Sequence, residues 1–138
     1  MFFFICMSDR LKDWAIHFLK HKDIFQKNLK EIKEDESGFI AEFNSKTEKY
    51  VIQDNLEFEN IPKEEYTCYV TLNTQKNFAK LLSEWRILIS FPKLKIIFVE
   101  KISNGKHWII SPYLHDKISD KASLKTGLKS LYEAAKGD

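Results

Sequence analysis

Two histidines and two aspartates near the C-terminus have side chains and spacing suited to acid–base or metal chemistry. They are His107, His115, Asp116 and Asp120, and they flank a short apolar run and a proline corner. A carboxylate beside an imidazole orients the ring and raises its pKa, as a general base or a metal ligand requires. These four residues are therefore the catalytic candidates. The alternative, which their position favours, is a capping cluster in which the two aspartates serve the N-terminus of the last helix.

A second group of residues is suited to binding phosphate. Lysines recur at every fourth position from Lys117 to Lys129, so they share one face of a helix. Further lysines surround a predicted hairpin turn with an aromatic residue beside them, which could stack on a base. The nucleic-acid-binding candidates are Lys101, Asn104, Lys106, Trp108, Lys117, Lys121, Lys125 and Lys129. The alternative is that the lysines only keep a helix face solvated.

Charge is divided unequally along the chain. Residues 1–66 carry 10 basic and 14 acidic side chains, a net charge of −4, whereas residues 67–138 carry 12 and 6, a net charge of +6. A basic half is expected to face an anionic partner such as DNA or RNA. If folding scattered these charges over the whole surface, the asymmetry would carry no such meaning, and the sequence does not decide between the two outcomes.

The common catalytic signatures are missing from the sequence. It has no glycine-rich phosphate loop and no Gly-x-Ser-x-Gly motif, and it contains only 4 glycines. The two cysteines, Cys6 and Cys68, lack the spacing of a zinc site or of a disulfide framework. We therefore expect no metal site and no classical enzyme activity. Cys68 lies in a strand-like run, where a buried free thiol is expected, and a reducing, cytoplasmic location follows.

Apolar periodicity predicts three helices and five strands. The first helix is expected to be long, because Leu11, Phe18, Phe25 and Ile32 continue one 3.6-residue face. The predicted helices lie at 8–34, 74–91 and 120–135, and the predicted strands at 39–43, 50–52, 66–72, 94–99 and 108–110. The order α-β-β-β-α-β-β-α indicates an α/β or α+β fold with a mixed sheet of about five strands flanked by three helices. Gly127, inside the last helix, predicts a close backbone approach there.

The predicted element order over residues 8–99 is a helix, three strands, a helix and a buried strand. This order resembles that of the restriction-endonuclease-like superfamily, which includes Holliday-junction resolvases. The resemblance implies association with nucleic acid. Active members hold a divalent metal, Mg²⁺ or Mn²⁺, on an acidic residue of the second strand and an acid-x-Lys motif of the third. Here the third predicted strand reads Thr67-Cys68-Tyr69-Val70-Thr71 and has neither an acid nor a lysine. The resemblance therefore implies a protein without the standard nuclease site; any catalysis would be that of a metal-dependent nuclease.

We predict one globular domain over residues 8–138, preceded by an apolar extension at 1–7 that is too short to span a membrane. The leading prediction is a nucleic-acid-associated protein. The alternative is a non-enzymatic protein-interaction module that forms a homodimer, since an aromatic content of 14% is more than one small core needs. A third prediction is a small-molecule binder with an aromatic pocket between sheet and helix, for which the sequence suggests no ligand.

Overall fold

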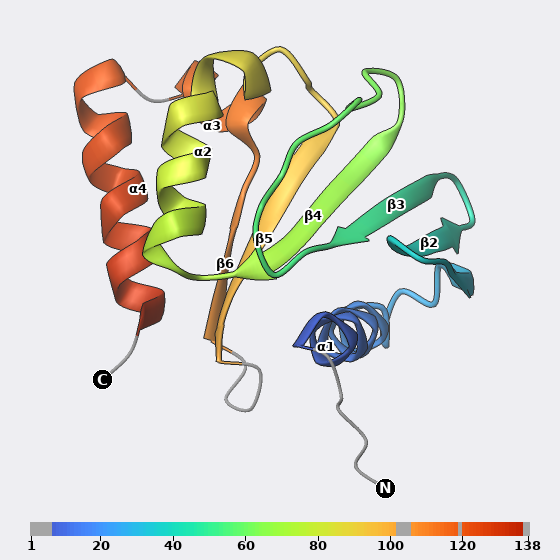
Figure 1. Cartoon of the computed structure of the whole chain (residues 1–138). Helices are drawn as coiled ribbons and strands as arrows, with labels where there is room; N and C mark the ends of the chain where they lie inside the picture. The colour runs from blue at the N-terminus through green and yellow to red at the C-terminus, as the bar shows by residue number, and fades with distance from the viewer. Residues whose placement is uncertain (1–6, 102–105, 119, 137–138) are drawn as a thin grey trace, which may run out of the picture.

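The structure is a computed structural model that describes residues 7–101, 106–118 and 120–136. Within these residues six strands form one sheet and four helices flank it (Figure 1). The strands are β1 (Leu29–Glu34), β2 (Gly38–Phe43), β3 (Thr47–Ile52), β4 (Tyr66–Leu72), β5 (Leu94–Lys101) and β6 (Lys106–Ile110). The helices are α1 (Met7–Lys22), α2 (Gln75–Leu88), α3 (Pro112–Ile118) and α4 (Lys121–Lys136). The mixed α/β fold predicted from the sequence is confirmed, with one more strand and one more helix than expected.

The strands lie in the sheet in the same order as in the chain, β1 to β6. Strands β1, β2 and β3 form an antiparallel meander, β4 and β5 continue parallel to β3, and β6 returns antiparallel to β5. Parallel neighbours need a connection that crosses the sheet. Residues 53–65 make the first crossing, from β3 to β4, and α2 makes the second, from β4 to β5.

Two separate apolar clusters cover the two faces of the sheet. Helix α1 packs on one face through Leu11, Ala15 and Leu19, whereas α2 and α4 pack on the other. Side chains alternate along a strand, so β5 supplies both clusters. Ile97 and Val99 face α1, whereas Ile96 and Phe98 face α2 and α4. Strand β5 is therefore the central strand buried on both faces that its apolar sequence predicts.

The predicted first helix, at 8–34, is wrong beyond Lys22. The Asp23 carboxylate accepts hydrogen bonds from the Asn28 and Leu29 amides at 3.0 and 2.9 Å, which closes a turn, and the chain then enters β1. An irregularity in the pairing of β1 with β2 lies between Leu29 and Glu31. This bulge lets Leu29 and Ile32 pack on the same apolar cluster, a spacing of three that imitates a helix.

The missing strand also changes the predicted element order. Four strands, not three, lie between α1 and α2, and the last of them, β4, pairs in parallel with β3. The short helix α3 was not predicted either, although Pro112 at its start is a favoured first helical residue. The hairpin between β5 and β6 is confirmed by their antiparallel pairing. Its predicted turn lies outside the described residues.

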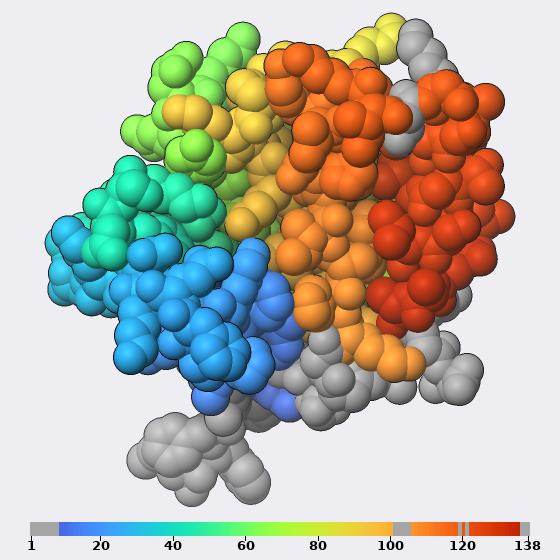
Figure 2. Space-filling view, turned by 180° about the vertical axis from the view of Figure 1, so that it is seen from behind, coloured from blue at the N-terminus to red at the C-terminus, as the bar shows by residue number. Residues whose placement is uncertain are grey.

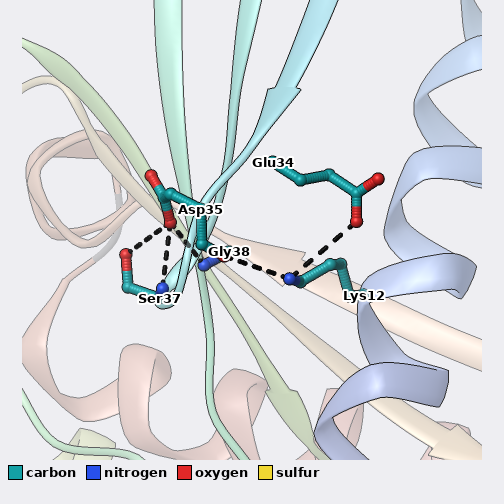
Figure 3. A network of polar contacts seen from close by, with 5 residues as sticks. All are labelled: Lys12, Glu34, Asp35, Ser37 and Gly38. Carbon is teal, nitrogen blue, oxygen red and sulfur yellow. Dashed lines mark hydrogen bonds and ion pairs between the residues drawn. The ribbon is translucent and has the colours of Figure 1, made fainter.

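A polar network fastens α1 to the turn between β1 and β2 (Figure 3). The Lys12 Nζ atom donates to the Asp35 carbonyl at 3.1 Å and lies 3.9 Å from a Glu34 carboxylate oxygen. The Asp35 carboxylate accepts hydrogen bonds from Ser37 N, Ser37 Oγ and Gly38 N at 2.8 to 2.9 Å. Partial burial raises the pKa of Asp35, but these hydrogen bonds outweigh burial and lower it below its ordinary value.

Two predictions about particular residues are wrong. Phe25, expected on the inner face of a long helix, is 95% exposed in the turn that follows α1. Gly127, expected at a close backbone contact, has nothing within 4 Å of the position where a Cβ would lie. Among the described residues, none of the helices combines the length and the apolar character that a membrane crossing requires.

Candidate nucleic-acid interface

The four catalytic candidates do not form one cluster. His107 lies on β6 and its imidazole packs against the rings of Trp14 and Phe18 of α1, at centroid distances of 5.3 and 5.0 Å. His115 lies on α3, which packs with α2 and α4 on the opposite face of the sheet. There its Nδ1 atom lies 2.9 Å from the Ser111 carbonyl oxygen. The two histidines therefore belong to different layers of the molecule.

The two aspartates have structural partners. The Asp120 carboxylate accepts hydrogen bonds from Ser123 N at 2.8 Å and Ser123 Oγ at 3.1 Å, which caps α4. The Ser123 amide is the main cause that lowers the pKa of Asp120. Asp116 Oδ1 accepts a hydrogen bond from Trp85 Nε1 at 3.1 Å and so joins α3 to α2. Among the described residues, no group of three or more His, Cys, Asp or Glu side chains is placed to hold a metal ion.

Trp108 cannot stack on a base as predicted, because it is a core residue. It is 5% exposed, its ring stacks on Phe98 at 4.4 Å, and its Nε1 atom donates to Asn73 Oδ1 at 2.8 Å. On the same hairpin, Lys106 is exposed at the start of β6. Asn104 and the side chain of Lys101 lie outside the described part of the structure.

The lysines of α4 lie where the periodicity places them. Lys125 and Lys129 are exposed, whereas Leu128 and Tyr132 are buried against the sheet. Within the described residues, neither lysine has an ion-pair partner. Lys121 begins the same helix, but its side chain is not among those described. Lys117, on α3, is also exposed. Its ammonium group, unlike those of Lys125 and Lys129, lies over an aromatic ring, 4.3 Å from the centroid of the Tyr113 ring.

Folding places the strands of the two charged halves of the sequence in different parts of the sheet. Because strand order follows chain order, β1, β2 and β3 form one end of the sheet, and β5 and β6 form the other end next to α4, whereas α1 lies across one face and packs on β3, β4 and β5. Figure 2 shows this division as a blue and cyan side opposite an orange and red side. Among the described residues, the strands of the acidic half therefore lie at a different end of the sheet from β5, β6 and the last helix of the basic half.

A cavity of about 510 Å³ opens between α2, α3 and α4, next to the basic face. It is lined by Leu82, Trp85, Arg86, Ile89, Asp116, Leu124, Lys125 and Leu128. Sequence reasoning named Asp116 and Lys125 for different roles and missed Arg86. It assigned Trp85 no functional role. The approach of α3, which was not predicted, brings these four side chains together.

A buried ion-pair cluster on the α1 face was also missed. Glu48 is 5% exposed, with Lys95 Nζ at 3.4 Å and Lys46 Nζ at 3.9 Å from its carboxylate oxygens. Burial is the main cause that raises the pKa of the neighbouring Tyr50 above its ordinary value, and Glu48 adds to it. Burial likewise raises the pKa of Cys68 to about 12, so this thiol is uncharged at neutral pH and is no nucleophile.

Comparisons with known proteins identify no relative. No family model, no curated protein and no solved structure matches the chain. The likeness to restriction-endonuclease-like proteins therefore stays a prediction.

Proposed function

We propose that this protein associates with nucleic acid through the exposed face of α4. The observation that carries the proposal is the position of the basic half: residues 67–138 have a net charge of +6 in the sequence, and their described strands β5 and β6 and helix α4 lie at one end of the sheet. A polyanion is attracted to that end and repelled by the other, so the encounter is oriented. The lysines of α4 are the groups that would then contact phosphates.

The composition of the α4 face supports close contact with a phosphate backbone. Between and beside its lysines the helix exposes small side chains, which let a ligand approach the helix closely. They are Ser123, Thr126, Gly127 and Ser130. Glu133 is the only acidic residue in the helix. Lys125 and Lys129 lie one helical turn apart, about 6 Å along the axis, so both can contact one strand.

The proposal is binding without cleavage. The four candidate catalytic side chains lie in two layers and have partners that explain their positions. The described residues also lack a set of carboxylates suited to Mg²⁺ or Mn²⁺. A nuclease of the kind that the sequence resembles needs such a set to orient water.

The test is binding of labelled single- and double-stranded DNA and RNA over a salt series. Releasing counterions makes log K fall with log[salt] by about 0.7 to 0.9 per phosphate contact. The double variant Lys125→Gln/Lys129→Gln should therefore bind more weakly and lower the slope by about 1.5 to 2. The control is Lys20→Gln/Lys30→Gln, which removes the same charge from exposed positions in the acidic half of the sequence.

Equal losses in both double variants would show that only total charge matters and would refute a binding face on α4. The absence of binding at low salt would refute the function altogether. Each reaction is repeated with Mg²⁺ or Mn²⁺ and run on a denaturing gel. Cleavage that requires the metal would refute the proposal of binding without cleavage.

Protein association is the second candidate function, and one observation favours it. Phe25 is 95% exposed and the adjacent Ile24 is 52% exposed, at the end of α1 and away from the basic helix. Exposed aromatic residues are enriched where proteins bind one another. Sedimentation over a range of concentrations, on the parent and on Phe25→Ser, decides whether this corner forms a homodimer. A mass that stays monomeric in both would exclude it.

A further inference from the structure

The cavity between α2, α3 and α4 has the properties of a ligand site. Its volume of about 510 Å³ lies within the range of small-molecule pockets. Half of its lining residues are aliphatic: Leu82 of α2, Ile89 at the C-cap of that helix, and Leu124 and Leu128 of α4. An apolar cavity with a few polar groups at defined positions is the usual form of a site that holds an organic ligand.

The polar groups of the cavity define the charge of that ligand. Arg86 comes from α2 and Lys125 from α4, so two cations on different helices line one cavity. Both side chains are exposed, and neither has an ion-pair partner among the described residues. Asp116 is the only anionic group in the lining. The positive charge therefore exceeds the negative, and a ligand with an anionic group is favoured.

Trp85 gives the cavity an aromatic surface whose orientation is fixed. Its Nε1 atom donates to Asp116 Oδ1 at 3.1 Å, and this bond joins the last turn of α2 to α3. A ring held in this way loses little freedom when a flat ligand packs against it. The second oxygen of Asp116 has no hydrogen-bond partner among the described residues, and it can accept from an amino group of the ligand.

A nucleotide combines these features, since it has a phosphate, a flat ring and amino groups on that ring. We propose that the cavity holds an unstacked base of single-stranded nucleic acid, with the adjoining phosphate between Arg86 and Lys125. This inference rests on the proposed function, because Lys125 belongs both to the α4 face and to the cavity. A duplex keeps its bases paired and stacked, so it contacts the lysines of α4 but leaves the cavity empty.

The test compares three ligands of equal length and charge per strand: a single-stranded oligonucleotide, the same oligonucleotide without bases, and a duplex. Trp85→Leu removes the flat ring, and Leu82→Phe fills the cavity without changing charge. Stacking of one base on an aromatic side chain is worth about 1 to 3 kcal/mol. Both variants should therefore weaken binding of the single strand about 5- to 150-fold and leave the abasic strand and the duplex unchanged.

A spectroscopic measurement shows directly whether a base reaches the cavity. Trp108 is buried and Trp14 is half-buried on the opposite face of the sheet, so Trp85 is the tryptophan that lines the cavity. Adding the single-stranded oligonucleotide should quench part of the tryptophan emission, and this part should be missing in Trp85→Phe. The abasic strand should cause no such quenching. Thermal unfolding of each variant checks that it is folded.

Two negative outcomes can be told apart. If the single strand and the abasic strand bind equally well, or if Leu82→Phe binds the single strand as the parent does, the cavity holds no base. The proposed function then stands on the lysines of α4 alone, provided that Lys125→Gln/Lys129→Gln still lowers affinity. If no nucleic acid binds at low salt, the proposed function and this inference both fail.

Discussion

Gly38 is expected to tolerate no side chain. It begins β2, where a Cβ atom would lie 2.0 Å from the Tyr50 carbonyl oxygen and 3.0 Å from the carbonyl carbon on β3. Non-bonded heavy atoms are stable at about 3.5 Å or more, so the two strands would have to separate by more than an ångström in Gly38→Ala. The obstacle is backbone, which cannot move away as the end of a flexible side chain can.

The cost of that separation follows from the bonds around the glycine. The Gly38 carbonyl accepts from Asp35 N at 3.0 Å, Gly38 N donates to Asp35 Oδ1 at 2.8 Å, and Ile52 N donates to the Ser37 carbonyl at 2.8 Å. Overpacking costs about 1 to 3 kcal/mol, and each weakened hydrogen bond adds about 0.5 to 1.5 kcal/mol. We therefore expect Gly38→Ala to lose about 3 to 4 kcal/mol of unfolding free energy.

The assay is urea unfolding followed by far-UV circular dichroism. The midpoint should fall while the slope of the transition stays the same, because the fold and the buried surface are kept. The melting temperature should fall by roughly 10 °C or more, at about 4 °C per kcal/mol for a domain of this size. A loss below about 1 kcal/mol would refute the reasoning, since it would mean that β2 moves away from β3 at little cost.

Two further predictions use exposed positions. Gly127→Ala should stabilise the protein by about 0.5 to 1 kcal/mol, because a methyl group in α4 meets nothing within 4 Å and alanine favours the helix; a loss of stability in the same urea assay would contradict this. The pKa of Asp35 is lowered in the folded state, so its carboxylate stabilises the fold above the unfolded pKa of about 3.9 and loses this effect as pH falls through the lower folded value. Asp35→Asn should therefore be less stable than the parent at pH 7 but lose less stability on acidification, as urea midpoints from pH 7 to pH 3 would show.

Long elements with one strong pattern were predictable from the sequence. The amphipathic spacing of α2 and α4 and the doubly apolar run of β5 match the burial in the structure. Elements whose pattern depends on a distant partner were not predictable. Leu29 and Ile32 look helical because a bulge, set by pairing with β2, turns both toward the same apolar cluster. Short α3 has too few residues to show a period.

The candidate site was predictable in its charge but not in its shape. The four-residue spacing of Lys125 and Lys129 was enough to place them on the exposed face of α4. Trp108 looked equally available, but alternation on β6 points its ring toward the core, where Asn73 satisfies the indole N–H. The cavity required three helices to converge, and no local pattern contains that information. Trp85, the tryptophan of the cavity, was therefore assigned no functional role.

The strand order has a consequence for how the chain folds as it is synthesised. Every strand after β1 pairs with the strand that precedes it in sequence, so each new strand finds its neighbour already formed. Such pairings close short loops, which favours rapid folding. Helix α1 is the exception. Its apolar face is completed by Val70 on β4 and by Ile97 and Val99 on β5, so this helix, which is synthesised before the sheet, is fully covered only after β5 has followed.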